Sequence, residues 1–267
     1  MRRPLTTAIL LLAASACDPA AEAPRPDDAP ALAGWTRAAW APHDGRDAED
    51  RGTGVVFLTT GGIGTAPRED TLLFRARPAA DAPPVAALVV TYAADGGWRH
   101  DVAAARPVEP RLLEYGYEEA GVPTDSADAS GRWVRGVLGL DPAGAPVRGW
   151  AELVEGRSAE LRWAEHLVGQ PVFLLRPSTE AFRRAPDGPV LPTPVPGAGP
   201  DALATGSAIE VAIYPIERRG DWLHVRVVAP SDFCVPGDEW PRHETRAWIR
   251  YLDERGRPLV WYFTRGC

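Results

Sequence analysis

The sequence contains no lysine and no asparagine, and each of its 29 basic side chains is an arginine. Its formal net charge is −7, and it has no long run of basic residues. Phosphate binding needs a concentrated positive face, so this composition argues against nucleic acid as a partner. Arginine nevertheless stacks on aromatic rings and forms forked contacts with carboxylates, which lysine does not do.

Motifs that mark common catalytic and cofactor sites are also missing. None of the five histidines stands in a His-Glu-x-x-His pattern or beside a Cys-x-x-Cys pair, so we expect no metal and no cofactor. No serine stands in a Gly-x-Ser-x-Gly motif, so no catalytic residue is predicted. The glycines at 61–64 lack the full dinucleotide spacing, and no Gly-Lys-Thr is present, which argues against a phosphate loop.

The N-terminal leader has no apolar run long enough to cross a bilayer. Arg2 and Arg3 precede the short run from Leu5 to Leu12, an arrangement typical of an export signal. The segment 12–17, Leu-Ala-Ala-Ser-Ala-Cys, resembles the lipobox of bacterial lipoproteins. This resemblance implies that Cys17 becomes the lipid-modified N-terminus and anchors the protein in a lipid bilayer. The alternative is an ordinary signal peptide cut after Ala16, which leaves Cys17 free.

Only two other cysteines are present, Cys234 and Cys267. Because an exported protein meets an oxidising compartment, one intramolecular disulfide between them is the simplest expectation. Closing such a loop contributes roughly 3–4 kcal/mol in the chain-entropy model. Reduced, metal-bound or intermolecular cysteines are the alternatives.

Tryptophan, in contrast, is abundant, and its spacing repeats. Two segments, 131–137 and 220–227, open with Gly-x-Trp followed by an aliphatic and a basic residue. Each is followed by two more tryptophans, and the same number of residues separates the two members of each pair. The four are Trp150, Trp163, Trp248 and Trp261, and we expect them in the core or at its edge. The shared spacing predicts one small β unit that occurs twice.

Side chains in segment 222–227 alternate between the two faces of a strand. One face carries Leu223, Val225 and Val227, which we expect in the core. The other carries Trp222, His224 and Arg226, with Trp133 and Arg135 as counterparts in the first copy. These five are the candidate ligand-binding residues, although core and surface positions both stay open for Trp133 and Trp222.

The second copy, with Gly-Asp-Trp-Leu-His-Val and then Ala-Trp-Ile-Arg, is similar to the Gly-x-Trp-x-x-Val … Gly-Trp-Val hallmark of the bacterial SH3 (SH3b) family. The first copy keeps the glycine before its second tryptophan as Gly149, whereas the second has Ala247. The resemblance implies an all-β fold with two small SH3-like barrels in tandem. Between recognisable strands, we expect a polar loop at Gly121 to Ser130 and a helical turn at Ala164 to Val168.

Proline-rich stretches outside the two copies mark the predicted boundaries. The expected segments are a signal peptide (1–16), a disordered tether (17–34), a first SH3-like domain with extensions (50–177), a semi-rigid proline-rich linker (178–204) and a second SH3-like domain (205–267). The linker is expected to hold the two halves apart.

Three function hypotheses follow. The first is a membrane-anchored cell-envelope protein, facing the periplasm or the exterior, whose SH3-like modules bind an extended protein segment or peptidoglycan peptide. The second is a structural or scaffold subunit of an envelope protein complex. The third is a cell-wall hydrolase, for which no catalytic domain is left in the chain.

Overall fold

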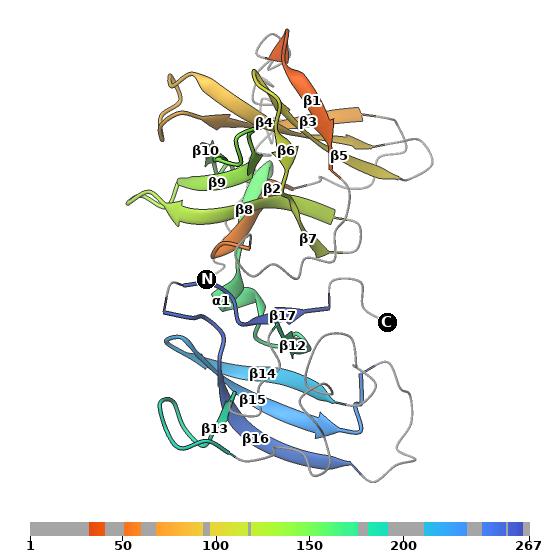
Figure 1. Cartoon of the computed structure of the whole chain (residues 1–267), viewed down its shortest axis with the longest axis vertical. Coiled ribbons are helices and arrows are strands. Elements are labelled where there is room, and N and C mark those ends of the chain that lie inside the picture. Colours follow the sequence, from red (N-terminus) through yellow and green to blue (C-terminus); the bar gives the residue numbers. More distant parts are fainter. Residues whose placement is uncertain are drawn as a thin grey trace, which may run out of the picture.

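The computed structural model describes residues 32–40, 51–59, 68–92, 97–116, 119–175, 181–191, 211–233, 242–254 and 256–263. Within these ranges the protein is all-β, with two antiparallel sheets and one short helix, α1 (Trp163–His166), between them (Figure 1). The leader, the lipidation candidate Cys17 and the disulfide candidates Cys234 and Cys267 lie outside the described residues.

The first sheet has eleven strands. From one edge to the other they are β1 (Thr36–Ala39), β5 (Trp98–Ala104), β4 (Pro84–Tyr92), β3 (Arg68–Arg75), β10 (Pro146–Glu152), β9 (Trp133–Leu140), β8 (Glu119–Ala127), β2 (Gly54–Leu58) and β11 (Ser158–Arg162). Two short strands lie off this path, β6 (Glu109–Pro110) beside β9 and β7 (Leu113–Gly116) beside β8. All of these pairs are antiparallel. Strands β3–β4, β4–β5, β8–β9 and β9–β10 follow each other in the chain, whereas β1–β5, β3–β10, β2–β8 and β2–β11 join segments that are far apart in sequence.

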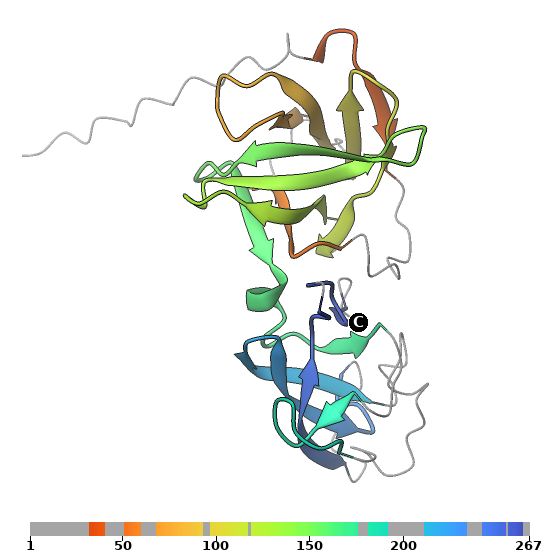
Figure 2. The same cartoon turned by 60° about the vertical axis from the view of Figure 1, so that its left-hand side comes forward.

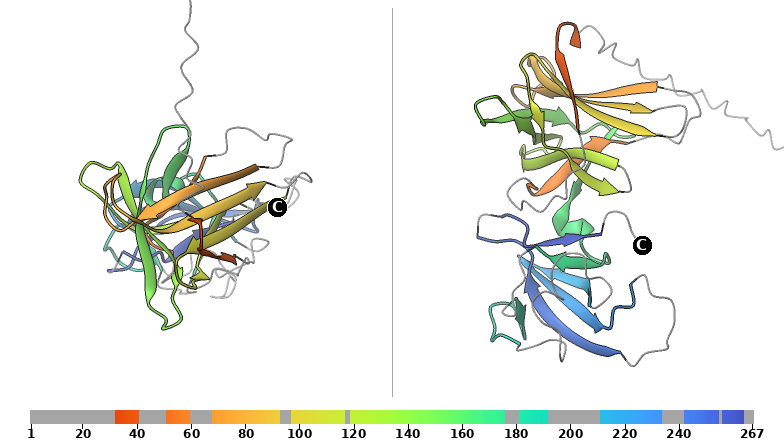
Figure 3. Two further views of the ribbon diagram at one scale, coloured as in Figure 1. Left: turned by 90° about the horizontal axis from the view of Figure 1, so that it is seen from above. Right: turned by 45° about the vertical axis from the view of Figure 1, so that its right-hand side comes forward.

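This sheet curls around one hydrophobic core. Strands β3, β4 and β5 form one layer, and β8 and β9 form a second layer facing it (Figure 2, Figure 3). Alternate residues of both layers point inward, among them Phe74, Leu88, Val122 and Val134, and all four side chains are fully buried. Burial of a large aliphatic or aromatic side chain contributes about 1.5–3 kcal/mol, so this set supplies much of the stability of the first half.

The second sheet has six strands. In order across the sheet they are β13 (Phe182–Arg183), β16 (His243–Arg250), β15 (Trp222–Ala229), β14 (Ala212–Arg219), β12 (Val172–Leu174) and β17 (Val260–Tyr262). Its core contains the predicted aliphatic set Leu223, Val225 and Val227, each fully buried.

The two halves share this second core. Trp163 of α1 is fully buried, and its ring meets Trp261 of β17 edge-on, with centroids 4.6 Å apart. The Trp163 indole N–H donates to the carbonyl of Arg51 at 2.8 Å, and the Arg51 guanidinium lies 4.3 Å from the Trp261 ring centroid. Val55 of the first sheet also belongs to this cluster. The halves are therefore packed against each other through apolar contacts.

Strand pairing places the change from one sheet to the other earlier than the predicted boundary at 177/178. Strand β12 was expected in the first domain and β13 in the linker, but both pair with strands of the second sheet. The cause is burial, because Phe182 is fully buried in the second core although two arginines and a proline-rich stretch follow it. Helix α1 stands at the junction of the two sheets (Figure 1), and of the predicted linker 178–204 the structure describes only residues 181–191.

Candidate functional site

Strand β15 forms the centre of the candidate site. Trp222, His224 and Arg226 are half-buried on the face opposite the aliphatic core set, as the alternation predicts. A two-residue loop that begins at Gly220 joins β14 to β15. Gly220 has a φ of +56°, a conformation that favours glycine and suits the tight turn of a hairpin. The tight turn therefore determines which side chains of β15 point outward, beginning with its first residue, Trp222.

We call the outer surface of β14, β15 and β16 the arginine–aromatic face. Directly opposite residues of antiparallel strands point to the same side, so its side chains stand in three rows. The rows are Arg219, Trp222 and Arg250; Glu217, His224 and Trp248; and Tyr214, Arg226 and Arg246. All of them are half-buried or exposed.

Ring contacts order the middle of this face. The His224 imidazole stacks on Trp248, with centroids 4.9 Å apart and planes 18° from parallel. The Arg219 guanidinium lies 5.1 Å from the Trp248 ring centroid, and that of Arg226 lies 4.5 Å from the Tyr214 ring centroid. Cation–π contacts of this kind hold long arginine side chains in place at a gain of about 0.5–1 kcal/mol at exposed sites.

A polar network surrounds Arg226. Its guanidinium lies 3.3 Å from Asp232 and 3.4 Å from Glu244, and the Tyr214 hydroxyl donates to Asp232 at 2.5 Å. Burial raises the pKa of Asp232, but the Tyr214 hydrogen bond and the charge of Arg226 outweigh this and leave that pKa below its usual value. Burial, together with the bond to Asp232, raises the pKa of Tyr214, which keeps its hydroxyl protonated as a donor. The network fixes the Arg226 head group.

Within the described ranges, Arg246 differs from Arg226 in having no such polar network. It stands directly opposite Arg226 and is exposed. Among the residues that the structure describes, no carboxylate lies within ion-pair distance of it. Arg250 has one loose ion pair, 3.7 Å from Asp221, and exposed pairs of this kind contribute only about 0–1 kcal/mol. Like charges placed opposite each other are unfavourable, and the two carboxylates near Arg226 offset this repulsion. Arg246 itself keeps an exposed guanidinium with no carboxylate at ion-pair distance among the described residues.

The β9–β10 hairpin of the first sheet has the same register as β15–β16. In the second hairpin Trp248 lies opposite His224, which is two residues after Trp222. In the first hairpin Trp150 lies opposite Arg135, which is two residues after Trp133. The equivalent rows of the first hairpin are Trp133 and Glu152; Arg135 and Trp150; and Val137 and Arg148. The two hairpins can therefore be compared position by position.

The arginines on the outer face of the first hairpin are paired with a carboxylate of the same sheet. Asp125 accepts from Arg135 at 2.7 Å and lies 3.1 Å from Arg148. The Arg135 guanidinium is also 5.9 Å from the Trp150 ring centroid. Both arginines of the outer rows therefore share one internal carboxylate.

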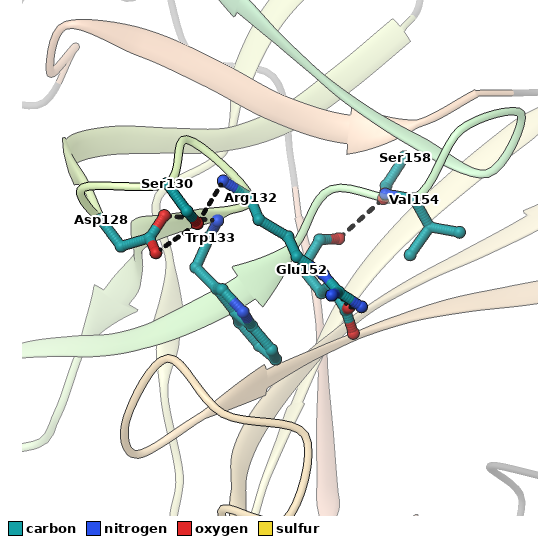
Figure 4. A network of polar contacts seen from close by, with 7 residues as sticks. All are labelled: Asp128, Ser130, Arg132, Trp133, Glu152, Val154 and Ser158. Atoms are coloured by element: carbon teal, nitrogen blue, oxygen red, sulfur yellow. Dashed lines mark hydrogen bonds and ion pairs between the residues drawn. The ribbon is translucent and has the colours of Figure 1, made fainter.

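The first tryptophan of that hairpin is covered. Trp133 is only 6% exposed, and its backbone N–H donates to Asp128 at 3.0 Å in the turn before β9 (Figure 4). Beside it, Arg132 donates to Glu152 at 2.7 Å, so the outer-face acid is paired as well (Figure 4). Of the two positions left open for the Gly-x-Trp residues, Trp133 takes the core one and Trp222 the half-buried surface one.

The candidate residues therefore fall on two sheets. Trp222, His224 and Arg226 lie together on the arginine–aromatic face, whereas Trp133 and Arg135 belong to the first hairpin. The other members of the face, on β14 and β16, were not among the predicted ligand-binding residues. The alternation rule would have found those on β16, since Arg246, Trp248 and Arg250 are two residues apart.

Other chemically capable side chains are built into the core. His100 of β5 is buried, and its Nε2 accepts the Ala120 N–H at 3.3 Å. Burial lowers the pKa of His100 to about 4, and the nearby Asp101 opposes this shift. Over the described ranges, no group of three or more histidine, cysteine or acidic residues is placed to hold a metal ion. In the same ranges, no helix has the length and apolarity needed to cross a membrane.

Comparison with protein-family models, curated proteins and solved structures found no match to this chain.

Proposed function

We propose that this protein is a lipid-anchored envelope protein with SH3-like modules, and that it binds an extended peptide or cell-wall ligand on the arginine–aromatic face. The single observation that carries the proposal is that face itself, with stacked rings at its centre and arginines on both sides. The lipobox-like segment ending at Cys17 supports the location, and the Gly-x-Trp hallmarks support the SH3-like assignment.

An extended chain suits this surface for a geometric reason. Rows on one face of a sheet are two residues apart, which is about 6.6–6.8 Å along the strand. Side chains on one side of an extended peptide repeat at the same distance, so such a peptide can contact successive rows. Half-buried Trp222 and Trp248 provide flat apolar area with an indole donor, which is suited to docking extended chains.

The test uses the exported chain extracted from envelopes with detergent, which also checks the anchoring, since an unanchored protein would be found in the soluble fraction. Tryptophan fluorescence is recorded during titration with peptidoglycan peptides and with extended synthetic peptides. We expect Trp248→Ala to weaken binding by at least about tenfold, as for a central aromatic contact residue. The control is Val154→Ala, because Val154 is an exposed residue of the first half.

Unchanged binding by Trp248→Ala, with the far-UV circular dichroism of the wild type, would refute the assignment of this face. A scaffold subunit would give no response to peptides or wall fragments and would instead retain a specific protein after cross-linking in the envelope. Release of soluble products from purified wall material would identify a hydrolase.

A further inference from the structure

We infer that the two hairpins have different tasks, and that the ligand of the arginine–aromatic face is an acidic extended peptide with the pattern acidic–x–apolar–x–acidic. This inference rests on the proposed function and specifies its ligand. It also assigns peptide binding to the second sheet alone, with the matching face of the first sheet serving the stability of the protein.

The matched positions of the two hairpins carry different charges. In the first hairpin the three outer rows hold two arginines and one glutamate, Arg135, Arg148 and Glu152. In the second hairpin the same three rows hold three arginines and no acid. Arg246 and Arg250 stand at the positions of Arg148 and Glu152, whereas Arg226 replaces Val137 and His224 replaces Arg135. The register is the same, so the difference comes from the side chains and not from the backbone.

Internal partners increase this difference. The two arginines of the first hairpin share Asp125, and its glutamate pairs with Arg132. In the second hairpin Arg226 lies near two carboxylates and Arg250 has one loose ion pair, whereas exposed Arg246 has no carboxylate at ion-pair distance within the described part of the chain. The protein carries a net charge of −7, so an exposed arginine without a close carboxylate stands out as a place for an external one.

The spacing on β16 defines the pattern. Arg246, Trp248 and Arg250 are two residues apart and lie on one face, with Trp248 between the two arginines along the strand. An extended peptide that lies along β16 presents its residues i, i+2 and i+4 at the same interval. Carboxylates at i and i+4 then meet the two arginines in charge-assisted hydrogen bonds, and an apolar side chain at i+2 meets the ring.

The mixture of charged and aromatic side chains on this face favours a peptide over a phosphate-bearing polymer as the ligand. The arginines of β16 flank an aromatic centre formed by Trp248 and His224, and Glu217 and Glu244 lie on the same face. A polyphosphate chain has no apolar group for the ring, and its continuous negative charge extends over these acids. A peptide supplies an apolar side chain at the ring and carries its negative charge only at the two arginine positions.

The experiment measures binding of two fluorescein-labelled peptides, Ala-Glu-Ala-Leu-Ala-Glu-Ala and its glutamine counterpart, to the exported chain in detergent. We expect the acidic peptide to bind about 5–10-fold more tightly than the neutral one at low salt, with the preference decreasing at high salt. Arg246→Gln should reduce this preference by about 3–5-fold. The matched variant Arg148→Gln, at the same register position in the first hairpin, should change it by less than about twofold.

Equal binding of the two peptides, still weakened by Trp248→Ala, would overturn the acidic pattern and leave the proposed function standing. No binding of either peptide would refute the pattern, and the proposed function would fail with it only if peptidoglycan peptides also gave no response. An equal loss in Arg148→Gln and Arg246→Gln would overturn the division between the hairpins. Displacement of the acidic peptide by inorganic polyphosphate at a lower concentration than by unlabelled peptide would replace the peptide with a phosphate-bearing polymer.

Discussion

Individual residues with the same spacing in the two copies meet different surroundings. Trp163 and Trp261 are buried and pack against each other, whereas Trp150 and Trp248 are half-buried on the outer faces of their hairpins. The expectation of core or edge positions for all four therefore divides into a core pair and a surface pair. The sequence identifies a tryptophan as a large apolar side chain, but its burial depends on which element covers it.

At the residue scale, we predict that His100 makes stability depend on pH. Burial, opposed by Asp101, lowers the pKa of His100 from its ordinary value of 6.5 to about 4. The folded pKa is the lower one, so the unfolded chain takes up the proton first as the pH falls. The stability that neutral His100 contributes is complete above about pH 6.5 and is lost as the pH falls towards 4.

The expected size of this effect is about 2–3 kcal/mol between pH 7.5 and pH 4.5, measured as the free energy of unfolding in urea. The variant His100→Gln should lack this part of the pH dependence, whereas His243→Gln, a change at an exposed residue, should retain it. An unaltered pH profile in His100→Gln would contradict the prediction.

At the scale of elements, the alternation of side chains on β15 was predicted correctly, but strand β8 of the first sheet was not. The residues from Gly121 to Ser130 were expected to form a polar loop, and most of them belong to β8. Thr124 is fully buried there, because its hydroxyl donates to Glu160 of β11 at 2.8 Å. Polarity predicts a loop only when such a partner from another strand is missing.

Gly149 and Ala247 occupy equivalent positions before the second tryptophan of each hairpin, and we predict that they cannot be exchanged. A Cβ at Gly149 would lie 2.7 Å from the Cβ of Phe74 and 3.0 Å from a methyl carbon of Val85. Phe74 is fully buried, so it has little room to move. Gly149→Ala should therefore lower the free energy of unfolding by about 1–3 kcal/mol through overpacking.

The matched change Ala247→Gly should cost about 0.5–1 kcal/mol, through backbone freedom and a lost methyl group. Urea unfolding followed by circular dichroism measures both variants. A Gly149→Ala protein as stable as the wild type would show that the Phe74 side chain can shift, and that close packing does not explain the glycine.

On the scale of the whole molecule, the core of the second sheet contains residues of the first. Val55 and Leu113 of the first sheet, and Leu167 directly after α1, pack in the same cluster as the strands of the second sheet. The Tyr262 hydroxyl of β17 also donates to the carbonyl of Tyr115 of β7 at 2.9 Å. Neither half completes its apolar surface without the other.

We therefore predict that the whole protein unfolds in a single cooperative transition. Far-UV circular dichroism and tryptophan fluorescence should give the same urea midpoint, because the two sheets lose their shared core together. Trp261→Ala, which removes part of that core, should shift both signals equally by about 3–5 kcal/mol in the free energy of unfolding. Two separate transitions, only one of them shifted by the variant, would show that the halves fold independently.

The sequence alone determined the all-β class and the alternation on β15, because these depend on residues close together in the chain. Tertiary structure decided which tryptophans are covered, which arginines find carboxylates and where the first sheet ends. Asp125 and Arg148 are far apart in sequence, and so are Trp163 and Trp261, and only the folded chain brings each pair into contact. Local periodicity fixes which face a side chain occupies, whereas burial and ion pairing depend on partners that distant segments supply.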